Sequence, residues 1–586
     1  MIRTYFKNII AVCSVCCGLA VICACSDSYM EDLNTDETKA ESIEPSAQLT
    51  TALLQTYGDF GFMDTYRSYI TGFTQHFAGG WNVTNYAGSV HAEDDQMRLV
   101  WDQLYGVGIK NIVDAIANSE DKPNMNAVLR IHRVYLMGIL TDIYGDIPCS
   151  EAGLGFVKGI ATPEYDKQED IYNFFFEELA ACVAQLGSGN DRIGGDVTSL
   201  NGEVAAWKRY ANSLRLRYAM RISDVNAAKA QEEFQKALTA DGGYITSAAD
   251  DAYIIYTDGP FTLYDGSRDL DFRVNALGEI LYGQDPTSPT FVCSTFFNIM
   301  KDNSDPRLYR VCRHYINTKR AETKPDREWN VDVTDEVIDY LKRTNDVEQP
   351  NNPGAAWYND WVNAPANAEI PTLEKLVNLY PEAGFDGSNY PARMMRPFLN
   401  IDFEMPDRPG TLINYAEVEF LLAEAVLKGW NVPGTVADHF ENGVRASIDW
   451  MNTHYLQASE KIGKDEVDEF VKALVAGPLL ENAKETINTQ AWILHMMNPS
   501  EAWANLRRSD YPVLMDRSKL GKFEFTYDDD NLQTPTRLRY PILEDQYNHE
   551  NYNEAIQRIG TKNSKGEDVD DWHHRVWWDK SDINVK

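Results

Sequence analysis

Two loop-like stretches of this sequence mix aromatic side chains with short polar ones, a combination that suits carbohydrate. Sugar rings have flat faces of polarised C–H groups that stack on Trp and Tyr, and their hydroxyls need polar side chains as hydrogen-bonding partners. The first stretch is glycine-rich and contains Trp81, Asn82, Asn85 and Tyr86. We expect these four residues to bind a ligand. A tryptophan that only packs the loop against the body would give the same pattern.

The second stretch follows Asn351-Asn352-Pro353-Gly354 and contains Trp357, Tyr358, Asp360 and Trp361. Three aromatic residues within five positions of a polar loop are hard to bury together, which favours exposure of at least one. A small local core beneath a long loop is the alternative. A weaker third group of candidates consists of Tyr264, Asp265 and Arg268.

Signals for catalysis and for metal binding are weak. The sequence has no Gly-x-Ser-x-Gly, His-Glu-x-x-His or P-loop spacing. A hydrolytic pair of carboxylates is defined by its separation in space, which a sequence does not give. The adjacent His573 and His574 cannot face one side of a helix, and the acidic segments 265–271 and 528–530 lack the EF-hand pattern, which favours solvated loops. An enzyme is therefore disfavoured, and no metal or cofactor is predicted.

The segment Glu203–Asp224 is the element expected to position much of the rest. Its apolar residues recur at helical spacing and fill most of the circumference, which predicts a helix packed on several sides. It also carries Lys208, Arg209, Arg215, Arg217 and Arg221, with no acid between Trp207 and Arg221. An anion site is one interpretation of these cations. Because the helix is predicted to be buried, pairing of the arginines with acids of neighbouring helices, such as Asp142 or Asp146, is favoured.

Helical periodicity recurs along the chain and predicts a mainly α-helical fold of stacked antiparallel hairpins, without a strict repeat. Predicted helices span residues 47–77, 94–118, 125–144, 168–186, 203–224, 227–238, 414–430, 435–451, 465–475, 481–497 and 500–508. Residues from 240 to about 410 are rich in Pro, Gly and scattered aromatics, which predicts a large irregular, ligand-facing insertion. The segment 536–579 is predicted to be irregular, with Trp572, Trp577 and Trp578 assigned to packing or a partner interface.

Charge and length limit the functional classes. The chain has 586 residues, 54 Lys plus Arg and 89 Asp plus Glu, a formal net charge of −35. Such an acidic surface repels phosphates, so nucleic-acid binding is not expected. Cys149, Cys182, Cys293 and Cys312 are too few and too scattered for a dense disulfide framework or a zinc site. One or two disulfides and free buried thiols remain equal alternatives.

The N-terminus has the features of an export signal. Arg3 and Lys7 precede an apolar run from Ile9 to Ile22, and this run is shorter than the ~20 residues of a membrane span. The arrangement Ile22-Cys23-Ala24-Cys25 resembles a bacterial lipobox. This resemblance implies that residues 1–24 are removed, that Cys25 carries lipid, and that the acidic residues 25–46 form a tether to one domain at 47–586.

Several motifs in order resemble the SusD/RagB family of outer-membrane lipoproteins, in particular its SusD-like subgroup. No single motif is specific, but together they span nearly the whole chain. They are Cys25, Asp32-Leu33-Asn34-Thr35-Asp36, residues 141–148 (TDIYGDIP), Pro163-Glu164-Tyr165-Asp166, Trp207 with residues 212–217 (NSLRLR), residues 414–425 (NYAEVEFLLAEA), Trp503 with Arg507-Arg508 and Tyr511-Pro512, Arg539-Tyr540-Pro541 and Trp577-Trp578-Asp579.

The resemblance implies a fold of tetratricopeptide-like helix pairs with one large loop-rich region. It also implies a cell-surface lipoprotein, facing outward from the outer membrane, that binds oligosaccharide and delivers it to a TonB-dependent transporter of the SusC type. Members of the family bind ligands and do not hydrolyse them. The alternatives are an extracellular glycoside hydrolase and a lid lipoprotein for a peptide importer.

Overall fold

The computed structural model describes ten ranges of the chain, almost all within one compact unit, Pro45–Lys586. The predicted signal peptide, Cys25 and residues 26–42 lie outside them. The ranges are residues 43–79, 83–88, 92–258, 272–282, 290–313, 315–317, 330–332, 398–520, 524–525 and 533–580.

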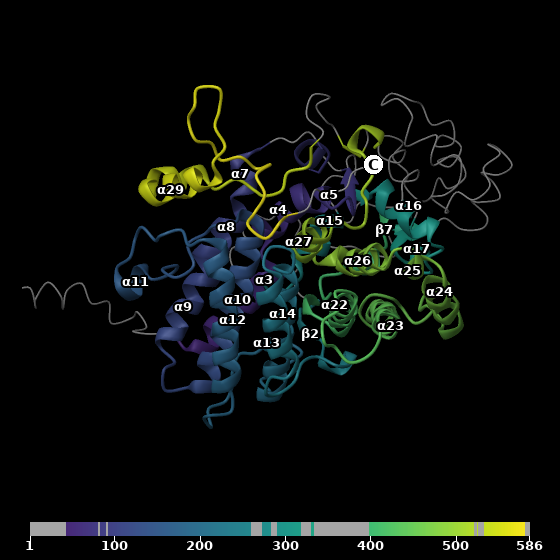
Figure 1. Ribbon diagram of the computed structural model, residues 1–586, viewed down its shortest axis with the longest axis horizontal. Coiled ribbons are helices and arrows are strands. Elements are labelled where there is room, and N and C mark those ends of the chain that lie inside the picture. The colour runs from purple at the N-terminus through teal and green to yellow at the C-terminus, as the bar shows by residue number, and fades with distance from the viewer. Residues whose placement is uncertain are drawn as a thin grey trace, which may run out of the picture. The chain divides into compact units, whose positions relative to one another are not determined.

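Long helices that pack as hairpins form the frame of the molecule (Figure 1). Helix α3 packs on α9, α10 on α12, α12 on α13, α13 on α14, and α22 on α23. This arrangement confirms the predicted mainly α-helical fold with tetratricopeptide-like helical hairpins. The frame helices are α3 (Pro45–Gly58), α9 (Lys110–Ala117), α10 (Pro123–Tyr144), α12 (Gln168–Gln185), α13 (Val204–Arg221), α14 (Ala227–Leu238), α22 (Tyr415–Leu427) and α23 (Val436–His454).

Local capping explains where several of these helices begin and end. Pro123 occupies the first turn of α10, where its missing N–H costs nothing, and Gly145 follows the helix at φ +90°. The Asn414 side chain accepts the backbone N–H of Glu417 at the start of α22. Thr435 and Asp438 form a reciprocal capping box on α23. These boundaries lie within three residues of the predicted ones.

A second group of helices continues from α23 and returns to α22. Helix α26 packs on α22 and on α27, and α27 in turn contacts α10. The elements are α24 (Lys464–Ala476), α25 (Pro478–Glu481), α26 (Ala483–Leu494), η7 (His495–Met497) and α27 (Pro499–Ser509). The sequence pattern predicted α24 and α27 and a helix at 481–497 that is divided into α26 and η7, but it did not predict α25.

The first predicted helix, 47–77, is interrupted after α3. The side chain of Asp59 caps a new helix by accepting the backbone N–H of Phe62 at 2.9 Å. A Cβ on Gly58 would stand 2.3 Å from the carbonyl oxygen of Phe272, so this crossing requires glycine. The chain continues through α4 (Phe60–Thr65), η1 (Tyr66–Ile70), α5 (Thr71–Phe73), β1 (Phe77–Gly79), η2 (Thr84–Gly88), α7 (Asp94–Met97), α8 (Leu99–Gln103) and η3 (Leu104–Ile109).

The described parts of region 240–410 consist of short helices and two-stranded antiparallel pairs. Strand β1 pairs with β3, β2 with β8, β4 with β7 and β5 with β6. The bounds are β2 (Ala252–Ile254), α15 (Ala276–Tyr282), β3 (Thr290–Val292), α16 (Ser294–Asp302), α17 (Leu308–Val311), β4 (Cys312–Arg313), β5 (Tyr315–Asn317), β6 (Asn330–Asp332), β7 (Phe398–Leu399) and β8 (Gly410–Ile413). The prediction of irregular structure therefore missed these short elements.

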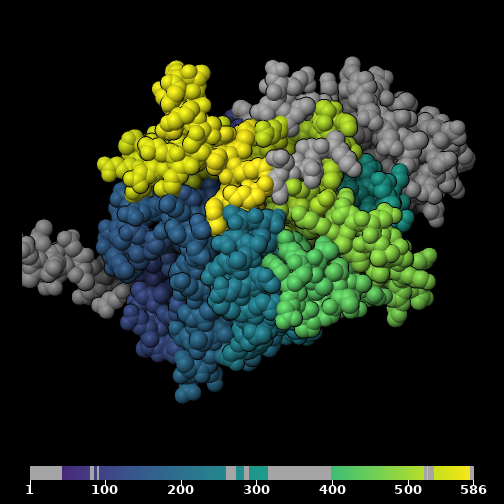
Figure 2. Space-filling view, in the orientation of Figure 1, coloured from purple at the N-terminus to yellow at the C-terminus, as the bar shows by residue number. Residues whose placement is uncertain are grey.

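The segment after residue 533 lies across the helical frame, and Figure 2 shows it in yellow over the blue and teal helices. The backbone N–H of Leu538 donates to the Ile143 carbonyl at 3.0 Å. The prediction of an irregular tail was wrong for two helices, α28 (Ile542–Tyr547) and α29 (His549–Ile559). Only Ala555 and Ile556 are buried in them, so few residues mark the pattern.

The remaining predictions on packing can be checked directly. Trp572 and Trp578 are buried, and Trp577 packs partly buried against the core, which confirms their assignment to packing. Cys149, Cys182, Cys293 and Cys312 are all free and buried. No helix within the described ranges combines the length and the apolar character that a bilayer crossing needs.

Candidate functional site

Two of the predicted ligand contacts lie in described residues. Asn85 and Tyr86 belong to η2, and both side chains are half-buried. The other candidates lie outside the described residues, and they are Trp81, Asn82, Tyr264, Asp265, Arg268, Trp357, Tyr358, Asp360 and Trp361.

Tyr86 is the half-buried member of a group of four rings, here called the Tyr86 cluster and consisting of Tyr69, Phe73, Tyr86 and Trp572. The rings of Tyr86 and Tyr69 stack with centroids 5.5 Å apart and an interplanar angle of 25°. Tyr69 in turn meets Phe73 at 5.8 Å and Trp572 at 6.4 Å. Tyr69, Phe73 and Trp572 are buried. Tyr86 therefore rests on a rigid aromatic base.

Three elements from the N-terminal part and one segment from the tail assemble this cluster. Helix η2 packs on η1, which carries Tyr69, and on α5, which carries Phe73. A Cβ on Gly72 would stand 2.4 Å from the Ala87 side chain, so glycine allows α5 and η2 to approach. The tail segment contributes Trp572, which is near the C-terminal end of the sequence.

Charged and polar groups surround the half-buried ring. Asp64 and Arg67 form an ion pair, and the Gln96 amide donates to Asp64 at 2.7 Å. The backbone N–H of Glu93 donates to the Tyr69 hydroxyl at 3.0 Å. Burial, together with Glu93 and Asp64, raises the pKa of Tyr86 above its ordinary value. The Tyr86 hydroxyl is therefore neutral at physiological pH and can both donate and accept.

Two arginines border the same cluster. The Arg517 guanidinium lies over the Phe73 ring at 5.9 Å and donates to the Gly88 carbonyl at 3.2 Å. The Arg539 guanidinium lies over the Trp572 ring at 5.4 Å. A half-buried aromatic plane beside an amide, a carboxylate and arginines provides both the stacking and the hydrogen bonds that a sugar requires.

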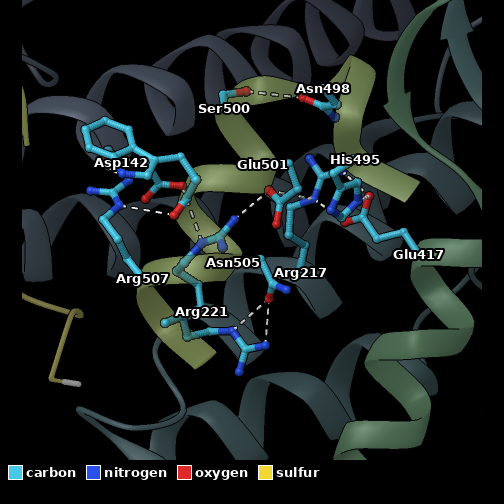
Figure 3. Close-up of polar contacts among 12 residues, drawn as sticks. Asp142, Arg217, Arg221, Glu417, His495, Asn498, Ser500, Glu501, Asn505 and Arg507 are labelled. Atoms are coloured by element: carbon cyan, nitrogen blue, oxygen red, sulfur yellow. Dashed lines mark hydrogen bonds and ion pairs between the residues drawn. The ribbon is translucent and has the colours of Figure 1, made fainter. Parts of the chain in front are cut away.

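A second polar cluster surrounds α13 and belongs to the frame (Figure 3). Arg217 donates two hydrogen bonds to the Glu417 carboxylate, at 2.6 and 2.8 Å, and lies 3.4 Å from Glu501. Arg221 binds Glu501 at 2.5 Å and lies 3.4 Å from Asp142. All five residues are buried, so a substrate cannot reach them without unfolding. This cluster stabilises the frame and is not a ligand site.

The prediction for the arginines of α13 was partly right. Arg221 does pair with Asp142, but Asp146 instead binds Arg558 of α29 at 2.6 Å. The main partners, Glu233, Glu417 and Glu501, were not anticipated, because they come from helices up to 284 positions away. All five cations of the helix are paired, since Lys208 meets Asp241 and Arg209 meets Asp250.

Electrostatics inside the frame cluster is closely balanced. Burial alone would raise the pKa of Glu417, but Arg217 and His495 outweigh it and hold that pKa at about 2. Burial raises the pKa of Asp142, although Arg221 and the Tyr172 hydroxyl oppose it. Within the described residues no group of three or more His, Cys, Asp and Glu side chains could hold a metal ion.

Sequence reasoning missed Tyr69, Arg517 and Arg539 as neighbours of Tyr86. Tyr69 lies in a run with a helical pattern. Trp572, which contacts both Tyr69 and Arg539, lies 503 positions after Tyr69 in the sequence. No local pattern records such pairings. The Arg539-Tyr540-Pro541 motif was the one available signal, and it was used only for the family resemblance.

Comparisons with known proteins agree on one family. A SusD-like family model, described as starch-binding associating with outer membrane, matches residues 37–541. A solved SusD-like protein from Bacteroidetes AC2a shares 37% identity, with a TM-score of 0.77 over 92% of this chain and 100% of that chain. A solved chitin-binding protein shares 30% identity, with a TM-score of 0.67 over 92% and 100% of the two chains.

A SusD homologue from Bacteroides uniformis ATCC 8492 shares the fold at 24% identity, with a TM-score of 0.64 over 92% of this chain and 100% of that chain. No curated protein gives a significant match. The family model and the first of these structures each cover most of the sequence, and both point to the same group. The chain therefore belongs to the SusD-like family, whose model is described as starch-binding and associating with the outer membrane.

Proposed function

We propose that this protein is a lipoprotein, anchored through Cys25, that captures oligosaccharide at the outer face of the outer membrane and delivers it to a SusC-type TonB-dependent transporter. The family description supports the ligand class and the membrane. A similar solved structure is that of a chitin-binding protein, which supports carbohydrate as the ligand. The anchor follows from the resemblance to a lipobox.

One observation carries the binding site: Tyr86 is half-buried and stacks on the buried Tyr69. A ring that packing already holds in place loses little conformational freedom when a sugar stacks on it. Asn85 on the same short helix supplies an amide that can serve hydroxyl groups. The glycan-binding surface proposed here is therefore centred on Asn85 and Tyr86.

Further contacts are proposed for the candidates outside the described residues. Trp81 and Asn82 precede Tyr86 by no more than five positions, and we propose that they bind the same ligand. Trp357, Tyr358, Asp360 and Trp361, together with Tyr264, Asp265 and Arg268, are proposed to contribute from the region between 240 and 410. Changing any one of these residues to alanine is expected to weaken binding.

Binding can be tested on the soluble chain that starts at Ser26. Isothermal titration with starch, chitin and acidic oligosaccharides would identify a ligand. Tyr86→Ala should then weaken its affinity by about fivefold, since aromatic stacking contributes on the order of 1 kcal/mol. Tyr547→Ala, which removes a tyrosine that is 73% exposed on α28, is the matched control and should leave affinity unchanged. Equal affinity of Tyr86→Ala and the unaltered protein would refute the proposed site.

The hydrolase alternative predicts that the purified protein releases reducing sugar from the ligand. The carboxylates of the frame cluster, Asp142, Glu417 and Glu501, are buried and ion-paired, so they are poor candidates for that chemistry. Reducing-sugar release that one carboxylate-to-amide substitution abolishes would establish the hydrolase. Peptides in the same titration panel decide between a glycan importer and a peptide importer. Co-purification of the lipidated protein with a TonB-dependent transporter tests the proposed partner.

A further inference from the structure

Arg517 is a buried cation that forms no ion pair within the described residues. Its side chain is 2% exposed, Nη1 donates to the Gly88 carbonyl, and Nη2 has no hydrogen-bonding partner among those residues. Burial lowers the pKa of Arg517 to about 10. Taking a guanidinium out of water costs several kcal/mol unless a carboxylate and hydrogen bonds compensate for it. An arginine left in this state therefore calls for a function.

Arg539 is the exposed counterpart on the other side of the aromatic cluster. It stacks over Trp572 at 5.4 Å, and among the described residues it forms no ion pair. Phe73 and Trp572 meet at 6.4 Å, so the ring contacts run from Arg517 through Phe73 and Trp572 to Arg539. The two arginines thus bracket the aromatic base on which Tyr86 rests.

Several other arginines have an acidic partner, although the buried Arg507 forms no ion pair within the described residues and donates to the carbonyls of Trp503, Thr536 and Asp142. The described arginines of α13, for example, each have an acidic partner, as do Arg307 with Asp305 and Arg508 with Glu424. In a chain with a net charge of −35, acids are abundant enough to neutralise most cations. Within the described residues Arg517 and Arg539 form no ion pair, so two cations lie beside the Tyr86 cluster.

Three carboxylates also lie near the cluster, Asp64, Asp571 and Glu93. Asp64 is neutralised by Arg67. Asp571 Oδ1 accepts the backbone N–H of His573 at 2.9 Å, and its Oδ2 accepts the Thr561 hydroxyl at 3.1 Å. Glu93 lies on the side of Tyr69 and Tyr86, where it adds one negative charge. Asp571 and Glu93 each leave a negative charge nearby, but within the described residues neither guanidinium forms an ion pair with these carboxylates.

We propose that the glycan bound beside Tyr86 is acidic, and that its carboxylate or sulfate group pairs with Arg539 in the field of the buried Arg517. This inference rests on the proposed function and specifies its substrate class. A guanidinium presents parallel N–H donors that fit both oxygens of a carboxylate or sulfate. The ring of the same sugar stacks on Tyr86, so charge and stacking act on one ligand.

The test compares matched oligosaccharides on the soluble chain that starts at Ser26. Galacturonic acid oligomers are titrated against their methyl-esterified forms, and sulfated galactan oligomers against desulfated forms. We expect at least one acidic member to bind about tenfold more tightly than its neutral counterpart, because a charge-assisted hydrogen bond contributes that much. Raising the salt concentration should reduce the difference.

Substitutions then test whether Arg539 causes the preference for acidic oligosaccharides. Arg539→Gln should remove the preference, Arg539→Lys should restore part of it, and Arg192→Gln, at an exposed arginine between α12 and α13, should leave it intact. Neutral and acidic forms that bind equally, with Arg539→Gln without effect, would overturn the inference. If Tyr86→Ala still weakened binding in that case, the proposed glycan site would stand. Binding that survives Tyr86→Ala unchanged would overturn both.

Discussion

The indole Nε1–H of Trp578 donates to Oδ1 of Asp142 at 2.9 Å, across 436 positions of sequence. Trp578 is fully buried, and Asp142 also accepts the Tyr172 hydroxyl at 2.5 Å. This contact joins the last described residues to α10 and places the tail segment that carries Trp572. The stability of the frame and the shape of the Tyr86 cluster are therefore linked.

Trp578→Phe should destabilise the protein, because it removes the indole donor and leaves part of Asp142 unsatisfied in a buried place. We expect the free energy of unfolding to fall by about 1–3 kcal/mol. Trp577→Phe, at the partly exposed neighbour, should change it by less than about 0.5 kcal/mol. Urea unfolding followed by circular dichroism measures both. Equal effects of the two substitutions would refute the role of the hydrogen bond.

Arg217→Met should be among the most destabilising single substitutions in the frame. It leaves Glu417 and Glu501 buried without their shared cation, and breaking such a pair costs about 3–5 kcal/mol. Arg445→Met, which breaks partly exposed pairs with Glu441 and Asp468, should cost less than about 1 kcal/mol. Thermal unfolding that shows similar losses for both variants would contradict the account of the frame cluster.

Acid should weaken the same cluster. The pKa of Glu417 is held at about 2 in the folded protein, below its value in the unfolded chain. Its contribution to stability is therefore present above about pH 4.3 and is lost as the pH falls toward 2. Glu417→Gln should flatten the dependence of the unfolding free energy on pH in that window. Titrating the urea midpoint between pH 5 and pH 2.5 tests this, and an unchanged slope would contradict it.

Asp251 should make the stability of the protein depend on pH in the opposite direction. Its Oδ1 accepts the backbone N–H of Tyr415 at 2.6 Å, and burial raises the pKa of its carboxyl to about 7. The folded state therefore holds a proton that the unfolded chain has released between about pH 4 and 7, so stability falls as pH rises through this window. Asp251→Asn keeps the acceptor and removes the titration. At pH 8 it should be more stable than the unaltered protein, by at most about 4 kcal/mol.

The two proteins should be indistinguishable near pH 4, where Asp251 is protonated in the folded state. Asp302→Asn, at an exposed carboxyl of α16, is the control. Differential scanning calorimetry at pH 4, 6 and 8 measures all three chains. A constant difference between Asp251→Asn and the unaltered protein across these conditions would contradict the raised pKa.

Arg517→Met separates stability from binding. Because it removes a buried cation that forms no ion pair within the described part of the chain, the midpoint of thermal unfolding should stay the same or rise. Affinity for an acidic oligosaccharide should nevertheless fall by about tenfold, since the positive field beside Arg539 is reduced. A loss of thermal stability without a loss of affinity would show that Arg517 serves only the fold.

Much of the frame could be predicted from the sequence, because long helices repeat their pattern over several turns. The helix around Trp207, the α10 boundary at Tyr144 and the pair of Arg221 with Asp142 were all expected. Asp146 was assigned wrongly, because its partner Arg558 lies on α29, where few buried residues mark a helix. Local pattern predicts elements well and the pairing of distant elements poorly.

The candidate site shows the same limit. Asn85 and Tyr86 were marked by their residue types, because aromatic and amide side chains in a glycine-rich loop form a local signal. Tyr69 carried no such signal, since it lies in a helical run and acquires its role only through stacking on Tyr86. Whether an arginine is paired or unpaired, as for Arg517, depends on contacts that only a folded chain defines.

A crystal structure of the protein with a bound oligosaccharide tests the central claim most directly. The account predicts a sugar ring face to face with Tyr86 at van der Waals distance, about 4 Å, with Asn85 hydrogen-bonded to a sugar hydroxyl and an acidic group against Arg539. An oligosaccharide bound at another surface, with Tyr86 free of contact, would contradict it.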